Sequence, residues 1–195
     1  LGYGWKAHLS NILAFVNYRA DIFLVNFFLT PAATGIYVIA VQISENLWML
    51  SRAASSVVLP RLSAMLENPK ARLALTNKGF LVVSAITAAA SVGVAVALWW
   101  LISPIFGEEY VEALPAFLWL LPGIIAGAGS RIYANCIAAA GKPEWNMYSS
   151  FGVVSINVVG NILLVPAYGI VGAAWATSVA YCFNAAVKLL LVSRL

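Results

Sequence analysis

Long apolar runs, broken by short segments rich in proline, glycine or charge, dominate the chain. Most runs reach about 20 residues, the length that an α-helix needs to cross a bilayer. They do not alternate apolar with polar residues, as the strands of a transmembrane β-barrel do. We therefore expect an all-α, polytopic membrane protein in which residues 1–195 form a single six-transmembrane-helix bundle. The expected helices cover about residues 8–29, 34–66, 75–102, 111–140, 143–165 and 169–192.

The composition excludes an ordinary water-soluble domain. Hydrophobic residues make up 63% of the chain and charged residues 9%, against about 45–50% and 25% in soluble domains. The net charge is +4, but no basic run is present, so we expect no nucleic-acid partner. With His8 as the only histidine, a histidine-based metal cluster is excluded, and we expect no cofactor. Cys136 and Cys182 lie in apolar helices, where packing is the commoner role.

The basic residues that flank the expected helices all fall on one side of the bilayer. They are Lys6, Arg61, Lys70, Arg72, Lys78, Lys142, Lys188 and Arg194. On the opposite side, the loop after the third helix carries Glu108, Glu109 and Glu112. The positive-inside rule makes the basic side cytoplasmic, so both termini are expected inside, in the inner (cytoplasmic) membrane. Aromatic residues, among them Tyr37, are expected in belts at the headgroups.

Five charged residues fall within the expected spans. They are Arg19, Asp21, Glu45, Arg52 and Arg131. A charge at the bilayer centre costs roughly 2.5–3.5 kcal/mol, so five in lipid would rival the stability of a whole domain, about 5–15 kcal/mol. Most of them must therefore face protein or a water-filled cavity. The competing interpretation is structural pairing that only locks helices together.

The expected helix 34–66 carries a polar stripe about 120° wide on one face. The stripe contains Gln42, Glu45, Asn46, Met49, Arg52 and Ser56. Glu45 and Arg52 stand about 10 Å apart along the helix axis, too far for direct neutralisation. The stripe is typical of a cavity wall.

Milder polar patterns occur on other expected helices. Arg131 and Asn135 are one turn apart, and Tyr181 and Asn184 share a face with Thr177 and Lys188. Asn, Ser and Thr also join membrane helices by hydrogen bonds, and this second interpretation stays open. The substrate-cavity candidates are Arg19, Gln42, Glu45, Asn46, Arg52, Arg131, Asn135, Tyr181 and Asn184.

Asn17 and Asp21 share one face of the first helix, and Arg19 points away from both. We expect Arg19 and Asp21 to face different spaces, one a cavity and the other the bundle interior. An interior acid beside Asn17 can bind a proton or Na⁺, so these two residues are the ion-coupling candidates. The alternative is a permanent ion pair between Asp21 and a basic residue, for which Arg131 is one candidate. No nucleophile, phosphate-loop or metalloprotease motif is found, so we expect no enzyme activity.

Several segments, in order and spacing, resemble the second half of polysaccharide flippases that carry O-antigen and other lipid-linked oligosaccharides. They are the runs 4–8, 17–21, 35–37, 44–48, 59–61 and 166–177. That family belongs to the multidrug/oligosaccharidyl-lipid/polysaccharide exporter superfamily. The resemblance implies that the chain is the C-terminal lobe of a two-lobed exporter and lacks the N-terminal six-helix lobe. Because the chain opens at Leu1 in the middle of a pattern, we expect a fragment of a longer chain.

The resemblance implies flipping of a lipid-linked oligosaccharide of the undecaprenyl-pyrophosphate type, for cell-surface polysaccharide biosynthesis. Arg19, Arg52 and Arg131 are then expected to contact phosphate, and Tyr18, Trp48 and Tyr133 to supply stacking surfaces for sugars. Rocking of one lobe against the other would give alternating access. The alternatives are a multidrug/cation antiporter of the same superfamily, a glycan ligase, and a membrane scaffold that transports nothing.

Overall fold

The computed structural model of the chain describes residues 8, 12, 19–65 and 68–195, and within them it is helical with no strand. Residues 19–28 form a first helical segment. The elements that follow are α2 (Pro31–Asn46), α3 (Trp48–Ala64), α4 (Pro69–Phe106), the 3₁₀ helix η1 (Glu108–Glu112), α5 (Ala113–Ala139) and α6 (Pro143–Val192). The expectation of an all-α membrane bundle is confirmed.

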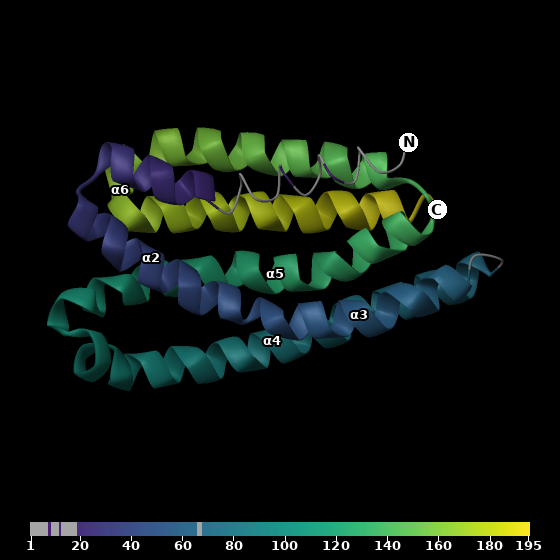
Figure 1. The fold of residues 1–195 in the computed structure, drawn as a ribbon, viewed down its shortest axis with the longest axis horizontal. Coiled ribbons are helices and arrows are strands. Elements are labelled where there is room, and N and C mark those ends of the chain that lie inside the picture. The colour runs from purple at the N-terminus through teal and green to yellow at the C-terminus, as the bar shows by residue number, and fades with distance from the viewer. Residues whose placement is uncertain (1–7, 9–11, 13–18, 66–67) are drawn as a thin grey trace.

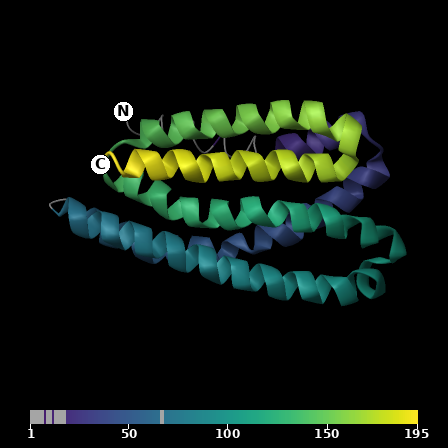
Figure 2. The same ribbon diagram turned by 180° about the vertical axis from the view of Figure 1, so that it is seen from behind.

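The long helices run side by side along the longest axis of the molecule (Figures 1 and 2). The end of α3, the start of α4, the α5–α6 turn and the C-terminus lie at one end of the bundle (Figure 1). The turn before α2, η1 and a sharp reversal within α6 lie at the other end. Helix α5 occupies the centre and contacts α2, α3, α4 and α6. The two ends of the bundle thus correspond to the two groups of loops, one basic and one acidic, that the charge pattern of the sequence distinguishes.

Three stretches in the described part of the chain are long and apolar enough to cross a membrane: α4, residues 108–139 and α6. The chain is therefore a multi-pass membrane protein. With 38 residues, α4 is about 57 Å long, well beyond the roughly 30 Å of bilayer hydrocarbon. It must tilt or extend out of the membrane. Helices α2 and α3, of 16 and 17 residues, are each shorter than one span, so the count of six stays a prediction.

Helix α6 folds back on itself at Gly169, where φ is 60° and ψ is −143°, a conformation that only glycine adopts readily. The two halves run antiparallel (Figures 1 and 2). The amide Nδ2 of Asn157 donates to Thr177 Oγ1 at 3.0 Å across this hairpin. We expected one helix to end at residue 165 and the next to begin at residue 169, but Pro166 stays within the helix and the break comes at Gly169 itself.

Other helix boundaries also differ from expectation, and prolines explain two of them. Helix α4 begins at Pro69 because proline lacks the N–H that the first turn leaves unused, and Asn68 caps it by accepting from Ala71 N at 3.1 Å. Pro104 lies inside α4 without ending it. The expected helix 34–66 is divided at Leu47, whose N–H bonds to Ser44 O at 3.1 Å in a tighter turn.

The α6 hairpin needs a glycine at residue 172. A Cβ there would lie 2.3 Å from the Leu164 carbonyl oxygen, which is backbone and cannot rotate away. We expect Gly172→Ala to destabilise the protein by about 1–3 kcal/mol, measured by thermal unfolding in detergent. The matched control is Gly93→Ala in α4, where nothing lies within 4 Å and the helix should gain up to about 1 kcal/mol. A Gly172→Ala protein as stable as the Gly93→Ala protein would contradict this packing.

Candidate ion and substrate sites

Asp21 is buried in the interior of the bundle, with 3% of its surface exposed. The hydroxyl of Tyr37, on α2, donates to Asp21 Oδ2 at 2.8 Å. The hydroxyl of Thr177, on the second half of α6, lies 3.4 Å from the same oxygen. The backbone N–H of Ile22 donates to Oδ1 at 2.8 Å. Three separate elements therefore meet at one carboxyl group.

A chain of hydrogen bonds leads from the first half of α6 to Asp21. Asn161 Nδ2 donates to Asn157 Oδ1 at 3.2 Å and to the Asn157 carbonyl oxygen at 2.8 Å. Asn157 in turn donates to Thr177 Oγ1, which leaves the Thr177 hydroxyl hydrogen free to point at Asp21. Every donor in the chain is oriented toward the carboxyl group. Oriented dipoles of this kind offset part of the cost of burying a negative charge.

A small cavity of about 10 Å³ adjoins Asp21. Its polar lining comes from Asp21, Ser44, Glu45, Thr177 and Tyr181. This volume is at the lower limit for one water molecule. The cavity therefore suits a single small ion or water and excludes a sugar.

The polar stripe of α2 and α3 lies mostly on the surface of the bundle. Gln42, Asn46 and Arg52 are exposed, and Glu45 is half-buried. Glu45 is within electrostatic reach of both Arg19 and Arg52. Arg19 is exposed while Asp21 is buried, so the two residues do face different spaces.

A second polar cluster joins α5 to α6. Arg131 is partly buried and lies within electrostatic reach of Lys188, which is 8% exposed. The Nε of Arg131 and the Nδ2 of Asn135 are buried without a hydrogen-bond partner in the described part of the chain. Nearby on α6, Asn184 accepts a hydrogen bond from Ser149. The unpaired groups here are donors, which suits an anion.

The structure buries several aromatic residues that we expected at exposed positions. Tyr37 is not an interfacial anchor: it is fully buried. Tyr181, expected in the substrate cavity, is 7% exposed and packs edge-on against Trp48 at 5.3 Å. Trp48 and Tyr133, expected as sugar-stacking surfaces, are each 3% exposed. Each is held by packing within the lobe and is covered in this conformation.

Two expectations about Asp21 have different outcomes. Asn17 lies outside the described residues. Arg131 is not among the hydrogen-bond partners of Asp21 in the described part of the chain, which are Tyr37, Thr177 and Ile22. We expected Tyr37 at the headgroups and placed Thr177 on one helix face with Tyr181 and Asn184, but linked neither residue to Asp21. Residue spacing indicates which residues share a helix face, but not which faces of different helices meet.

Comparisons with known proteins agree with this architecture. Residues 1–115 match the family described as "Polysaccharide biosynthesis protein". The chain belongs to that family. It is 24% identical over 171 residues to the probable low-salt glycan biosynthesis flippase Agl15 of Haloferax volcanii, covering 84% of this chain and 35% of the relative. The chain thus spans about a third of the length of that curated relative.

Solved transporter structures share the fold. The lipid II flippase MurJ, in an inward closed conformation, superposes with a TM-score of 0.76 at 18% identity, covering 94% of this chain and 41% of that one. An outward-facing MATE family multidrug resistance transporter of the MOP superfamily has the same TM-score and identity, covering 97% of this chain and 44% of that one. A MOP superfamily transporter from Pyrococcus furiosus gives 0.74 at 17% identity, with 96% and 42% coverage. The fold is that of one lobe of such a transporter.

Proposed function

We propose that the whole protein flips a lipid-linked oligosaccharide, of the undecaprenyl-pyrophosphate type, across the cytoplasmic membrane for cell-surface polysaccharide biosynthesis. This chain is the C-terminal lobe and works with an N-terminal lobe that faces it. The family and the flippase relatives support this proposal. The reaction is transport, and no bond in the substrate is made or broken.

The exposed polar stripe is the observation that carries the proposal. Gln42, Asn46 and Arg52 lie on the surface of a lobe that is otherwise rich in exposed apolar side chains. Lipid does not accommodate such a row of polar groups, so this face borders water or the other lobe. A water-filled space between two lobes, with a polar wall, is what a phosphate and many hydroxyls need to pass the bilayer centre.

Cationic groups are placed to hold the phosphates of the substrate. Arg19 and Arg52 present guanidinium groups on the lobe surface, and their fork geometry matches phosphate oxygens. Arg131, with an unpaired Nε and a neighbouring lysine, Lys188, forms a second cationic group between α5 and α6. Asn135 and Asn184 add amide groups for hydroxyls or phosphate. The pyrophosphate is the part of the substrate that these residues recognise.

Asp21 serves as the ion-coupling residue in this proposal. Its site has room for a proton or one small cation and is lined by oxygens, the ligands that hard cations prefer. It joins the first helical segment, α2 and α6, so occupancy changes the contacts among elements that line or support the stripe. A proton or Na⁺ gradient would then drive the rocking of the lobes.

A multidrug/cation antiporter is the second candidate, favoured by the likeness to a MATE transporter fold. A cavity for organic cations needs an excess of acidic groups. Here Arg19 and Arg52 share the exposed region with one acid, Glu45, and Asp21 is buried out of reach. The charge balance therefore favours an anionic substrate.

Arg52→Ala in the full-length protein should reduce flipping of a lipid-linked oligosaccharide in vesicles by about tenfold or more. The reason is the loss of charged hydrogen bonds to phosphate, worth about 1.5–3 kcal/mol. Arg61→Ala is the matched control: it removes an exposed arginine from the same helix, nine residues on and on the opposite face. Equal losses in the two variants, or a fall in the Arg52→Ala protein level, would count against a phosphate contact.

Asp21→Asn should abolish the response of flipping to a proton or Na⁺ gradient while leaving a folded protein. Asn keeps an oxygen that can accept from Tyr37, so the loss of stability should stay near that of one hydrogen bond, about 1–2 kcal/mol. Flipping in vesicles with and without each gradient measures the response, and Glu109→Gln in the exposed 3₁₀ helix is the control. Unchanged gradient dependence would remove Asp21 from the coupling role.

The proposed topology places both termini and the basic end of the bundle in the cytoplasm. In a protein with Cys136 and Cys182 replaced by alanine, a cysteine at Glu109 should react with an impermeant maleimide on intact cells. A cysteine at Lys70 should react only after the membrane is permeabilised, since both positions are exposed but at opposite ends. Reaction of both positions from the same side would refute this orientation.

A further inference from the structure

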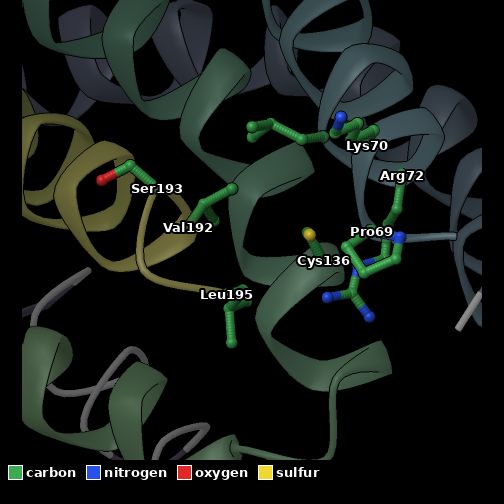
Figure 3. A pocket seen from close by; sticks show the side chains of 8 residues that line it. Pro69, Lys70, Arg72, Cys136, Val192, Ser193 and Leu195 are labelled. Carbon is green, nitrogen blue, oxygen red and sulfur yellow. The ribbon is translucent and has the colours of Figure 1, made fainter.

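A pocket separate from the Asp21 cavity and the polar stripe opens at the end of the bundle that holds the C-terminus. Its volume is about 130 Å³. It lies between the first turn of α4, Cys136 of α5 and the last residues of the chain, as Figure 3 shows. The residues that matter for its chemistry are Lys70, Arg72, Leu73, Cys136, Val192 and Leu195. None of these was a candidate for the transport path.

Arg72 is the unusual member of this pocket, because its side chain is only 6% exposed. From α4 the guanidinium group extends into the space beside Cys136 and Leu195 (Figure 3). The backbone of Arg72 is satisfied, since its N–H donates to Asn68 O at 3.0 Å and its carbonyl accepts from Thr76 at 2.7 Å. Within the described part of the chain its side chain makes no hydrogen bond or ion pair, and its nitrogens are not among the fully enclosed unpaired atoms, so they meet the open space of the pocket. A guanidinium at the wall of a largely covered pocket favours an anion there, because only a few waters can solvate its charge.

The electrostatics of the pocket select an anion. Among the described residues, its lining contains the side chains of Lys70 and Arg72 and no aspartate or glutamate side chain. The pocket also borders the first turn of α4, where Pro69 is the first helical residue and the positive end of the helix dipole lies. The N–H of Ala71 is already taken by the Asn68 cap, so the side chain of Arg72 is the main donor available.

The size and the apolar lining of the pocket narrow the choice of anion. At about 130 Å³ it has space for roughly four waters, well below the roughly 300–1,000 Å³ of sites for drug-sized ligands. One phosphate group fits, and an oligosaccharide does not. Leu73, Val192 and Leu195 form an apolar wall next to the cationic group, as a phosphate ester attached to hydrocarbon requires.

We propose that this pocket binds the phosphate of an anionic phospholipid, with Arg72 as the direct ligand and Lys70 at the rim. Basic pockets between transmembrane helices on the cytoplasmic side suit lipid headgroups of this kind. The bound lipid joins the start of α4 to α5 and to the end of α6. The site differs from that of the transported glycolipid, so it does not depend on the proposed substrate.

The test is lipid binding to the purified full-length protein in detergent, followed by native mass spectrometry and by thermal unfolding. Phosphatidylglycerol should bind with at least tenfold higher affinity than phosphatidylcholine and should raise the melting temperature. Arg72→Gln should lose that preference, and Arg72→Lys, which keeps the charge but not the fork, should retain part of it. Lys78→Gln, an exposed lysine further along α4, is the matched control and should bind like the wild type.

Three results would overturn the proposal. One is equal binding of the two lipids by the wild type. Another is full preference for phosphatidylglycerol in a folded Arg72→Gln protein. If that variant does not fold, the proposal is overturned when Lys70→Gln keeps the full preference and Arg72→Lys also binds like the wild type. The third is displacement of the lipid by inorganic phosphate at similar concentration, which would make the ligand a free phosphate.

Discussion

The burial of one carboxyl group, Asp21, constrains how this lobe is assembled. A carboxylate in a membrane bundle is tolerated only where the protein supplies hydrogen-bond donors in place of water. Here they come from Tyr37 on α2 and Thr177 on α6, with the Ile22 amide beside them. Donors on separate elements fix the spacing of the first segment, α2 and α6 together. The polar stripe of α2 and α3 takes its position from this arrangement.

The hairpin in α6 makes that arrangement possible. Glycine at residue 169 allows the reversal, and small residues let the two halves approach closely, as Gly160 does against Ala176. Asn157 then faces Thr177 across the hairpin at 3.0 Å. The hydrogen-bond chain that ends at Asp21 is therefore a consequence of backbone packing. A larger side chain at the Gly160–Ala176 contact would separate the two halves of α6. The series of hydrogen bonds would then break between Asn157 and Thr177.

Helical periodicity and proline placement predicted much of the fold. Apolar runs identified the membrane helices, and the stripe from Gln42 to Ser56 was visible from residue spacing alone. What spacing cannot reveal is which faces of different helices meet. Tyr37 looked like an interfacial aromatic because its partner lies sixteen residues away, across a turn. Arg72 looked like a topology signal because its burial depends on α5 and on the end of α6.

The buried acid and the cationic cluster of this lobe lie at different positions along the bundle, and the second half of α6 connects them. Asp21 lies in a donor-lined interior, while Arg131 and Lys188 form a cationic cluster further along. Thr177 and Lys188 share the second half of α6 and stand about 16 Å apart along it, at 1.5 Å per residue. No break lies between them, so in the proposed coupling any shift of Thr177 that follows ion binding or release at Asp21 also displaces Lys188. In the proposed mechanism, a charge change in the Asp21 cavity thus reaches the proposed phosphate-binding region through a rigid element, without a relay of side chains.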